Sequence, residues 1–437
     1  MISPDVVSYI LDVAKKKGAT EADVLAFEQE ERSASVRLGA VEKVTACRSV
    51  TVQLRAFLGK RVAFMKTSDV SREALDALVE KTYAMLAFSE EDAANGLPDP
   101  RLYPQRQKRL ELFDRSAGSY FLKDQIDEAL RMERAARAYD WRITNTEESV
   151  CDVGFGAVFY GSSAGFLGKY KSSHFSRMIN VIAQSQDGMQ TAYWHTTGRH
   201  RSMLDEPERV GEVAARRALQ QLGGRKIKTT EAPVVFDPIC AARFLGTLRQ
   251  AIDGGSLYRG ASFLCGRLGE IIASPLVTVC DDSLIPRLLG SRPFDWEGVA
   301  SRSVKVVEAG RFTSYLLDCY SARKLGMETT GNAGNSNFFL EKGSHSPQEI
   351  IASVKQGLYV VELMGHGTNV VSGDCSVGAR GLWIENGKLT YPVEEITIAE
   401  NLKNMLMGIE MVGNDLDFRS QTASPTLKVS RMTIGGD

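Results

Sequence analysis

The chain has 437 residues, of which 24% are charged and 43% hydrophobic, values typical of a globular protein and not of a disordered, collagen-like or coiled-coil chain. Its length predicts two or three domains. Lys and Arg (53) nearly balance Asp and Glu (54), for a net charge of −1, so the sequence lacks the basic excess of a protein that holds nucleic acid through its phosphates.

The beginning of the chain, Met1-Ile2-Ser3-Pro4-Asp5, has neither the basic nor the apolar region of a secretory signal. No apolar run reaches the length of about 18 residues that a membrane helix needs. The seven cysteines are scattered and form no C-x-x-C pair, which favours reduced thiols over disulfides or a cysteine zinc site. We therefore expect a cytoplasmic protein with no membrane or nucleic-acid partner.

The first half of the chain combines helices and strands. Apolar residues repeat with helical spacing after Pro4, and Gly18 follows three lysines, which predicts a helix that ends there. The other elements predicted in this half are, in order, short strands within 22–67, a helix at 71–87, a surface linker at 95–104, a helix at 122–138, strands within 141–195 and a helix at 206–222.

Residues 223–230 combine glycines with charge after a helix, so we place a domain boundary there, between an N-terminal α/β domain (1–224) and a C-terminal domain (231–437). The second half is rich in short strands and glycine turns. Asn386-Gly387 is a strong hairpin signal, and residues 308–313 form a similar pattern.

The predicted fold class is therefore α+β. The N-terminal domain has helices and antiparallel strands, and the C-terminal domain is a mostly antiparallel β domain, a curled sheet or partial barrel. Two helices are predicted in the second half, near 239–252 and 396–407.

The sequence contains few patterns of catalytic residues. None of its five histidines belongs to a zinc-binding helix motif, and His195 and His200, separated by Gly198, are interpreted as surface residues rather than ligands. Residues 161–165 match G-x-S-x-G, but their flanks look like the two strands of a hairpin, so we interpret Ser163 as a turn residue. Cys375 has no histidine near it in the sequence to activate a thiol.

The adjacent carboxylates and the glycine-rich segments of the sequence also match no catalytic or phosphate-binding pattern. The pairs Asp281-Asp282 and Glu394-Glu395 are neighbours on predicted strands and would point to opposite faces. No phosphate-binding or dinucleotide motif is present, so a phosphate-bearing cofactor is not indicated.

Residues 362–381 form the most unusual segment, with glycines recurring among polar and apolar residues. Glycine in strands marks bulges or the close approach of another backbone. The segment is either the edge of a groove that pairs with an extended peptide or a run of tight turns in a β domain. The candidate peptide-binding residues are Gly365, His366, Gly367, Thr368, Asn369, Gly373 and Asp374.

The same segment resembles the signature of the TldD/PmbA family. The resemblance rests on several motifs in order along the whole chain. They are Arg142-Ile143-Thr144-Asn145-Thr146-Glu147, Gly254-Gly255-Ser256-Leu257-Tyr258-Arg259, residues 293–299, residues 320–326, Gly373-Asp374-Cys375-Ser376, residues 378–387, residues 391–402 and Gly413-Asn414-Asp415.

The resemblance implies a role in peptide proteolysis, and it is to the PmbA (TldE) branch. In this family the TldD subunit carries H-E-x-x-x-H on a helix, together with a late cysteine ligand. The corresponding positions here are Leu245, Gly246 and Gln250, and residues 420–424 contain no cysteine. We therefore expect no metal, cofactor or catalytic residue in this chain, with zinc held by a TldD-like partner.

The sequence is compatible with three alternative functions. The first is a non-metal subunit that pairs with a TldD-like protein and binds an extended peptide, with a homodimer possible when the chain is alone. The second is a stand-alone hydrolase that uses Ser163, Cys375 or an unrecognised site. The third, suggested by the family's older name, is a regulatory protein that acts on DNA gyrase.

Overall fold

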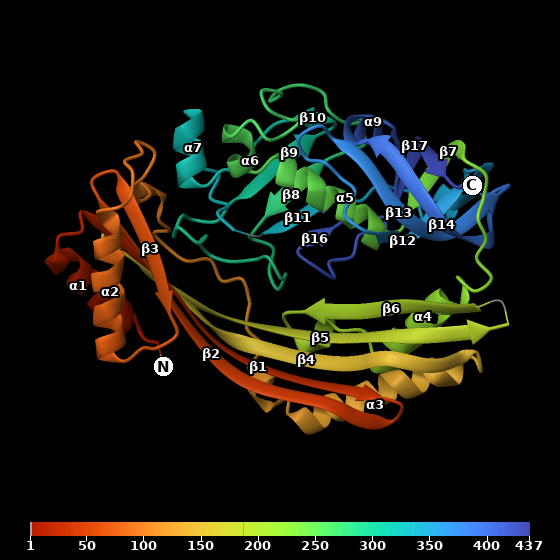
Figure 1. The fold of residues 1–437 in the computed structure, drawn as a ribbon, viewed down its shortest axis with the longest axis horizontal. Helices are drawn as coiled ribbons and strands as arrows, with labels where there is room; N and C mark the ends of the chain where they lie inside the picture. Colours follow the sequence, from red (N-terminus) through yellow and green to blue (C-terminus); the bar gives the residue numbers. More distant parts are fainter. Residues whose placement is uncertain (1, 187, 335) are drawn as a thin grey trace.

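The fold is described from a computed structural model of the chain, over residues 2–186, 188–334 and 336–437. A long, curved antiparallel sheet from the first half of the chain arches below a compact C-terminal half (Figure 1). The structure is of the α+β class, as predicted. Among the described residues, none of the helices combines the length and the apolar composition that crossing a bilayer requires.

The curved sheet has the strand order β3-β2-β1-β4-β5-β6. All neighbouring strands in this sheet are antiparallel. Burial alternates strictly along β5, where every second residue from Ser173 to Ala183 is buried. This period of two shows that one face is covered by other elements. The strands are β1 (Glu21–Arg37), β2 (Ala40–Leu58), β3 (Arg61–Thr67), β4 (Ile143–Ser162), β5 (Leu167–Ser185) and β6 (Gly188–Gly198).

Two pairs of helices cover this sheet. Helices α1 (Pro4–Lys17) and α2 (Arg72–Leu86) pack at one end (Figure 1), and α3 (Leu122–Tyr139) packs with α4 (Pro207–Leu219) over β4, β5 and β6. As predicted, α1 ends at Gly18, whose φ of 105° is readily adopted only by glycine. The intervening segments hold the short 3₁₀ helices η1 (Pro100–Leu102), η2 (Arg115–Ser119) and η3 (Arg201–Met203).

The G-x-S-x-G match is a turn, which confirms the hairpin interpretation. It connects β4 to β5, and Ser163 Oγ accepts a hydrogen bond from the backbone N–H of Ala22 at 2.9 Å. Ser163 therefore joins the hairpin to the start of β1 and is not placed on a strand-to-helix elbow.

The C-terminal half is built on a barrel. Its strands run in the order β14-β13-β12-β7-β17, and pairing between β14 and β17 closes the ring. The sequence had predicted a curled sheet or partial barrel, and the ring proves to be complete. Its pairings are antiparallel except for β7 with β12. The strands are β7 (Thr230–Phe236), β12 (Gln356–Met364), β13 (Asp374–Glu385), β14 (Lys388–Asn401) and β17 (Leu427–Gly435), with β15 (Ile409–Val412) beside β17.

A second, smaller sheet and several helices complete this half. The sheet has the order β10-β9-β8-β11-β16, and the main core lies between it, the barrel and α5. Its strands are β8 (Val279–Asp282), β9 (Ser303–Glu308), β10 (Arg311–Phe312), β11 (Asn337–Leu340) and β16 (Thr422–Ala423). The helices are α5 (Pro238–Ala251), α6 (Gly254–Tyr258), α7 (Cys319–Leu325), α8 (Pro347–Ala352) and α9 (Leu402–Met407).

The helix predicted at residues 396–407 is correct only in its second half. Of residues 396–407, only Leu402–Met407 is helical, because β14 continues through Asn401. Ile396 and Ile398 are buried while Thr397 is exposed, the alternation of a strand. Pairing with β13 on one side and β17 on the other holds this segment in the barrel. The Asn386-Gly387 hairpin is confirmed, with φ of 50° and 75° at the two turn residues.

Candidate functional site

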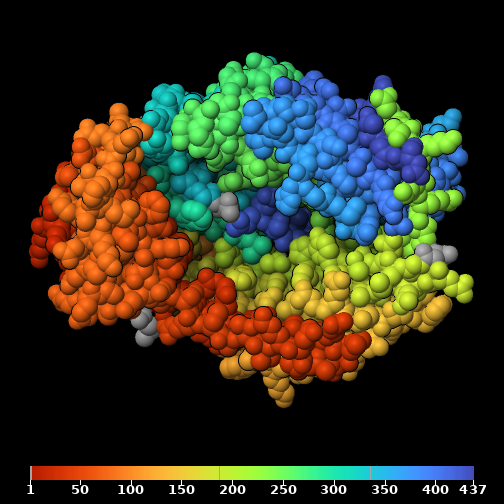
Figure 2. Space-filling model, in the orientation of Figure 1, coloured from red at the N-terminus to blue at the C-terminus, as the bar shows by residue number. Residues whose placement is uncertain are grey.

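A cleft separates the curved sheet from the C-terminal half, and Figure 2 shows the surface hollowed between them. Within the cleft lies a cavity of about 320 Å³ whose walls come from both halves of the molecule. Strand β6 contributes Trp194 and His195, α4 contributes Arg217, and β12 contributes Tyr359. The start of α5 and residues 415–424 form the remaining wall.

A buried ion pair joins the two halves at this cavity. Arg217 Nη2 donates to Asp237 Oδ2 at 2.9 Å, and Asp237, only 2% exposed, also accepts from the backbone N–H of Cys240 at 2.8 Å. Burial lowers the pKa of Arg217, but the attraction of Asp237 outweighs it and raises that pKa overall. Asp237 thus caps α5 and pairs with α4 at once, which holds one wall of the cavity in place.

Trp194 is within contact distance of two guanidinium groups. The carbon centre of the Arg217 guanidinium is 5.2 Å from the ring centroid and that of Arg419 is 4.7 Å from it, both within the range of a cation–π contact. Arg419 Nη1 also donates to the His195 carbonyl oxygen at 2.7 Å and to Asp205 at 2.9 Å. These contacts order β6 against residues 415–424.

The structure places His195 and His200 in different settings. His195 lies in β6 and faces the cavity, where burial and then the nearby charge of Arg419 lower its pKa, so its imidazole is neutral at neutral pH. His200 lies beyond the end of β6, and its Nε2 is 2.7 Å from the carbonyl oxygen of Glu111. Within the described residues, no three His, Cys, Asp or Glu side chains are grouped so that they could hold a metal ion.

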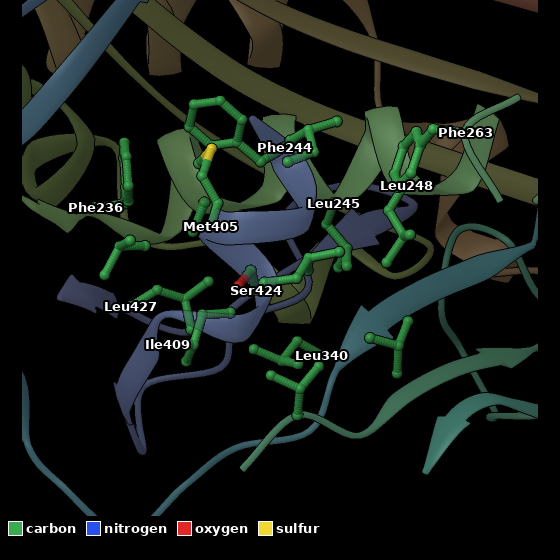
Figure 3. Close-up of a pocket in the computed structure, with 16 residues that line it drawn as sticks. Phe236, Phe244, Leu245, Leu248, Phe263, Leu340, Met405, Ile409, Ser424 and Leu427 are labelled. Atoms are coloured by element: carbon green, nitrogen blue, oxygen red, sulfur yellow. The ribbon is translucent and has the colours of Figure 1, made fainter. Parts of the chain in front are cut away.

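The positions that correspond to the zinc ligands of TldD-type chains lie on α5 and beside it. They are Leu245, Gly246 and Gln250, and residues 420–424. Leu245 is 8% exposed and lines an apolar pocket of about 40 Å³, and Ser424 lines the same pocket (Figure 3). Apolar side chains such as Phe236, Leu248 and Met405 surround it. A side chain at Gly246 would meet no described atom within 4 Å, and Gln250 is exposed. Residues far apart in sequence therefore meet here, in a setting without ligand side chains.

The predicted peptide-binding residues form the connection between β12 and β13. Gly365 and Gly373 have φ of 75° and 84°, and a side chain at Gly367 would lie 1.7 Å from the carbonyl oxygen of Ser376. Asn401 Nδ2 donates to Asp374 at 2.9 Å, which ties the end of the loop to β14. The segment is thus a tight, internally bonded turn, and its role in peptide binding stays a prediction. Cys375 lies in β13, where burial raises its pKa.

One feature of the cleft was missed by the sequence analysis. Strand β7 pairs with β12 only as far as Val360, so beyond that residue the side of β12 that faces away from β13 has no strand beside it in the described part of the chain. The carbonyl oxygen of Val361 accepts from Arg217 at 2.8 Å, and those of Leu363 and Gly365 accept from Arg243. Arginine side chains from α4 and α5 therefore occupy the free edge of β12. Only the tertiary structure brings these helices to that edge.

Models of one family match nearly the whole chain. The first domain of the PmbA/TldA metallopeptidases matches residues 22–86, the central domain 115–222 and the C-terminal domain 229–436. The chain is similar to the metalloprotease PmbA of Escherichia coli O157:H7, with 36% identity over 100% of this chain and 96% of that protein.

Solved structures share the fold over the full length. A crystal structure from Bacteroides thetaiotaomicron, described as a modulator of DNA gyrase, covers 100% of both chains with 27% identity and a TM-score of 0.94. TldE from Thermococcus kodakarensis covers 99% of this chain and 100% of its own, with 21% identity and a TM-score of 0.90, and shows the likeness of fold.

Proposed function

The chain belongs to the PmbA/TldD metallopeptidase family, and from this we propose that it is the PmbA/TldE-type subunit of a two-subunit metalloprotease. In this assembly it shapes the chamber that holds a peptide, while a TldD-like partner holds the zinc ion. When bound by the partner, zinc would supply the activation of the water that attacks the peptide bond. This chain binds and orients the peptide and supplies no metal ligand.

The observation that carries the proposal is the setting of Leu245. A leucine side chain has no atom that can bind zinc, and here it is buried in an apolar pocket with Leu248 and Met405. Gly246 provides no base, and Gln250 is exposed and does not line the pocket that holds Leu245. The chemistry of the side chains present does not fit a zinc ion at this place.

The cleft supports the peptide-binding part of the proposal. It contains a cavity of about 320 Å³ and, beside it, the edge of β12, where the carbonyl oxygens of Val361, Leu363 and Gly365 accept from arginines. An extended peptide that adds to this edge replaces the arginine contacts with main-chain hydrogen bonds. The loop from Gly365 to Asp374 continues the same edge and is expected to contact the peptide.

The assembly and its compartment are part of the proposal. The partner is a TldD-like chain, and the surface that meets it can meet a second copy of this chain when the partner is absent. All seven cysteines are free, which suits the reducing cytoplasm.

The test compares the chain purified alone with the chain mixed with a TldD-like protein. We expect the chain alone to contain essentially no zinc by elemental analysis and to leave an unstructured peptide intact. The mixture should cleave the peptide, and a chelator should stop it. The matched control is a TldD-like protein whose two motif histidines are replaced by alanine. About one zinc per chain in the purified protein, or cleavage by the chain alone, would contradict the proposal.

A further inference from the structure

A second cavity, of about 310 Å³, lies in the C-terminal half between the end of α5, helices α6 and α7, and residues 332–334. Helices α6 and α7 lie next to each other beside the second sheet (Figure 1). Its walls include parts of two segments that the sequence analysis singled out, residues 254–259 and 320–326. None of the residues that line it lines the cavity in the cleft.

Close packing of α6 on α7 places two carboxylates on one wall. A side chain at Gly254 would lie 2.1 Å from Ser321 Oγ, so only glycine allows this approach. Asp253 precedes α6 and Asp318 precedes α7. Each uses Oδ1 to accept from a backbone N–H, that of Gly255 at 2.9 Å and that of Ser321 at 2.7 Å. Neither Oδ2 atom accepts a hydrogen bond from another described residue, so one oxygen of each carboxylate is available to a ligand.

Two arginine side chains, those of Arg249 and Arg259, bring positive charge to the lining of the cavity. Arg249 donates to the carbonyl oxygen of Gly334 at 3.0 Å, and Arg259 donates to the Tyr258 hydroxyl at 3.3 Å. Neither forms an ion pair with a carboxylate in the described part of the chain, although each carries several N–H donors. The four charged residues sum to zero, with two positive and two negative groups.

Asn332 supplies the third kind of group. It is 5% exposed and lines the cavity, and neither its Nδ2 nor its Oδ1 has a hydrogen-bond partner among the described residues. A buried amide without partners is unfavourable. A peptide group placed beside it would satisfy both atoms, because a peptide bond offers one acceptor and one donor, as the side-chain amide does.

We propose that this cavity binds a short peptide of dipeptide size with free amino and carboxyl termini. The ligand carboxylate pairs with Arg249 and Arg259, and its ammonium group pairs with Asp253 and Asp318. The peptide bond between them pairs with the Asn332 amide. A zwitterion without net charge matches the balanced charges of the cavity. This binding requires neither zinc nor a partner chain and goes beyond the proposed subunit role.

The proposal is tested on the full chain by isothermal titration calorimetry. The probes are alanyl-alanine, its N-acetyl form, its C-terminal amide and inorganic phosphate. We expect alanyl-alanine to bind and each blocked form to bind at least about tenfold more weakly, since each loses a charge-assisted contact. Phosphate should give no binding. Absence of binding by alanyl-alanine, or equal binding of the blocked forms, would overturn the proposal. Binding of phosphate as tight as that of the dipeptide would reduce the cavity to an anion site and overturn it as well.

Two variants locate the site. Arg259→Gln changes an exposed side chain, and we expect it to weaken dipeptide binding about tenfold without altering the melting temperature. Asn332→Leu should weaken binding further. The control is Arg209→Gln, an exposed arginine on α4 outside the cavity, which should leave binding unchanged. Dipeptide binding that survives Arg259→Gln undiminished would place the ligand elsewhere and refute the proposal, whether or not Asn332→Leu folds.

Discussion

The guanidinium of Arg217 in α4 and the carboxylate of Asp237 at the start of α5 are 2.9 Å apart, and through them the N-terminal half is bonded to the first helix of the C-terminal half. Arg217 also donates to the carbonyl oxygen of Val361 and lies against Trp194. One arginine thus contacts a strand of the barrel, a strand of the curved sheet and a helix cap. These contacts surround the cavity in the cleft.

Removing the carboxylate of this pair should destabilise the protein strongly. Asp237→Ala leaves the Arg217 charge buried without its partner and also removes the cap of α5. We expect the free energy of unfolding in urea to fall by about 3 kcal/mol or more. Glu80→Ala breaks an exposed pair with Lys17 and serves as the control, with almost no expected change. Similar effects from both variants would show that the ion pair between the two halves stabilises the fold no more than an exposed pair does.

Glu128 should make stability depend on pH. It accepts from Tyr120 at 2.6 Å and Arg177 at 2.8 Å and from Arg201. Burial raises its pKa, but these hydrogen bonds outweigh burial and lower it below the ordinary value of 4.5. A carboxyl whose pKa is lower in the folded state stabilises the fold above its unfolded pKa, and this contribution is lost as the pH falls through the folded value.

The measurement compares the free energy of unfolding of the wild type and Glu128→Gln across pH. We expect the advantage of the wild type to be constant above about pH 5 and to shrink as the pH falls below 4.5. A difference that stays the same down to the acid range would mean that the ionised form of Glu128 has no special role.

Two helical glycines should respond in opposite directions to alanine. A side chain at Gly211 in α4 would lie 2.2 Å from the carbonyl oxygen of Met132 in α3, so Gly211→Ala should push the helices apart and cost about 1–3 kcal/mol. Gly246 in α5 faces open space, so Gly246→Ala should stabilise by about 0.5–1 kcal/mol through helix propensity. Thermal melts of both variants provide the comparison. The packing argument fails if Gly211→Ala melts at or above the wild-type temperature.

The loop between β12 and β13 can be tested for peptide binding through its exposed histidine. His366→Ala should leave the melting temperature unchanged and weaken the binding of a fluorescent extended peptide by about 1 kcal/mol, the value of one lost hydrogen bond. His345→Ala, at another exposed loop position, is the matched control and should bind as the wild type does. If the two variants bind equally well, the loop does not contact the peptide through this residue.

Much of the local structure followed from the sequence. The helices at Pro4–Lys17 and Arg72–Leu86 were predicted from apolar spacing, and the turn at Asn386-Gly387 from its two residues that tolerate positive φ. Residues 396–401 were misassigned because their strand state depends on β13 and β17, which lie elsewhere in the chain. The cleft could not be predicted either, since Trp194, Arg217 and Arg419 come from segments that share no local pattern.

By itself the sequence determined the features that depend on interactions within a few residues, which are most helices, their ends and the hairpin turns, and its motifs showed the resemblance to the family. Helical hydrogen bonds join residues four apart, and turn conformations depend on adjacent residues, so local composition is sufficient. Tertiary structure decided the closure of the barrel through β14 and β17, the ion pair of Arg217 with Asp237 and the burial of Leu245 beside Ser424. Those contacts join residues that only the packing of whole elements brings together. Whether they form depends on side-chain burial and strand pairing across the whole fold, and no short sequence pattern specifies them.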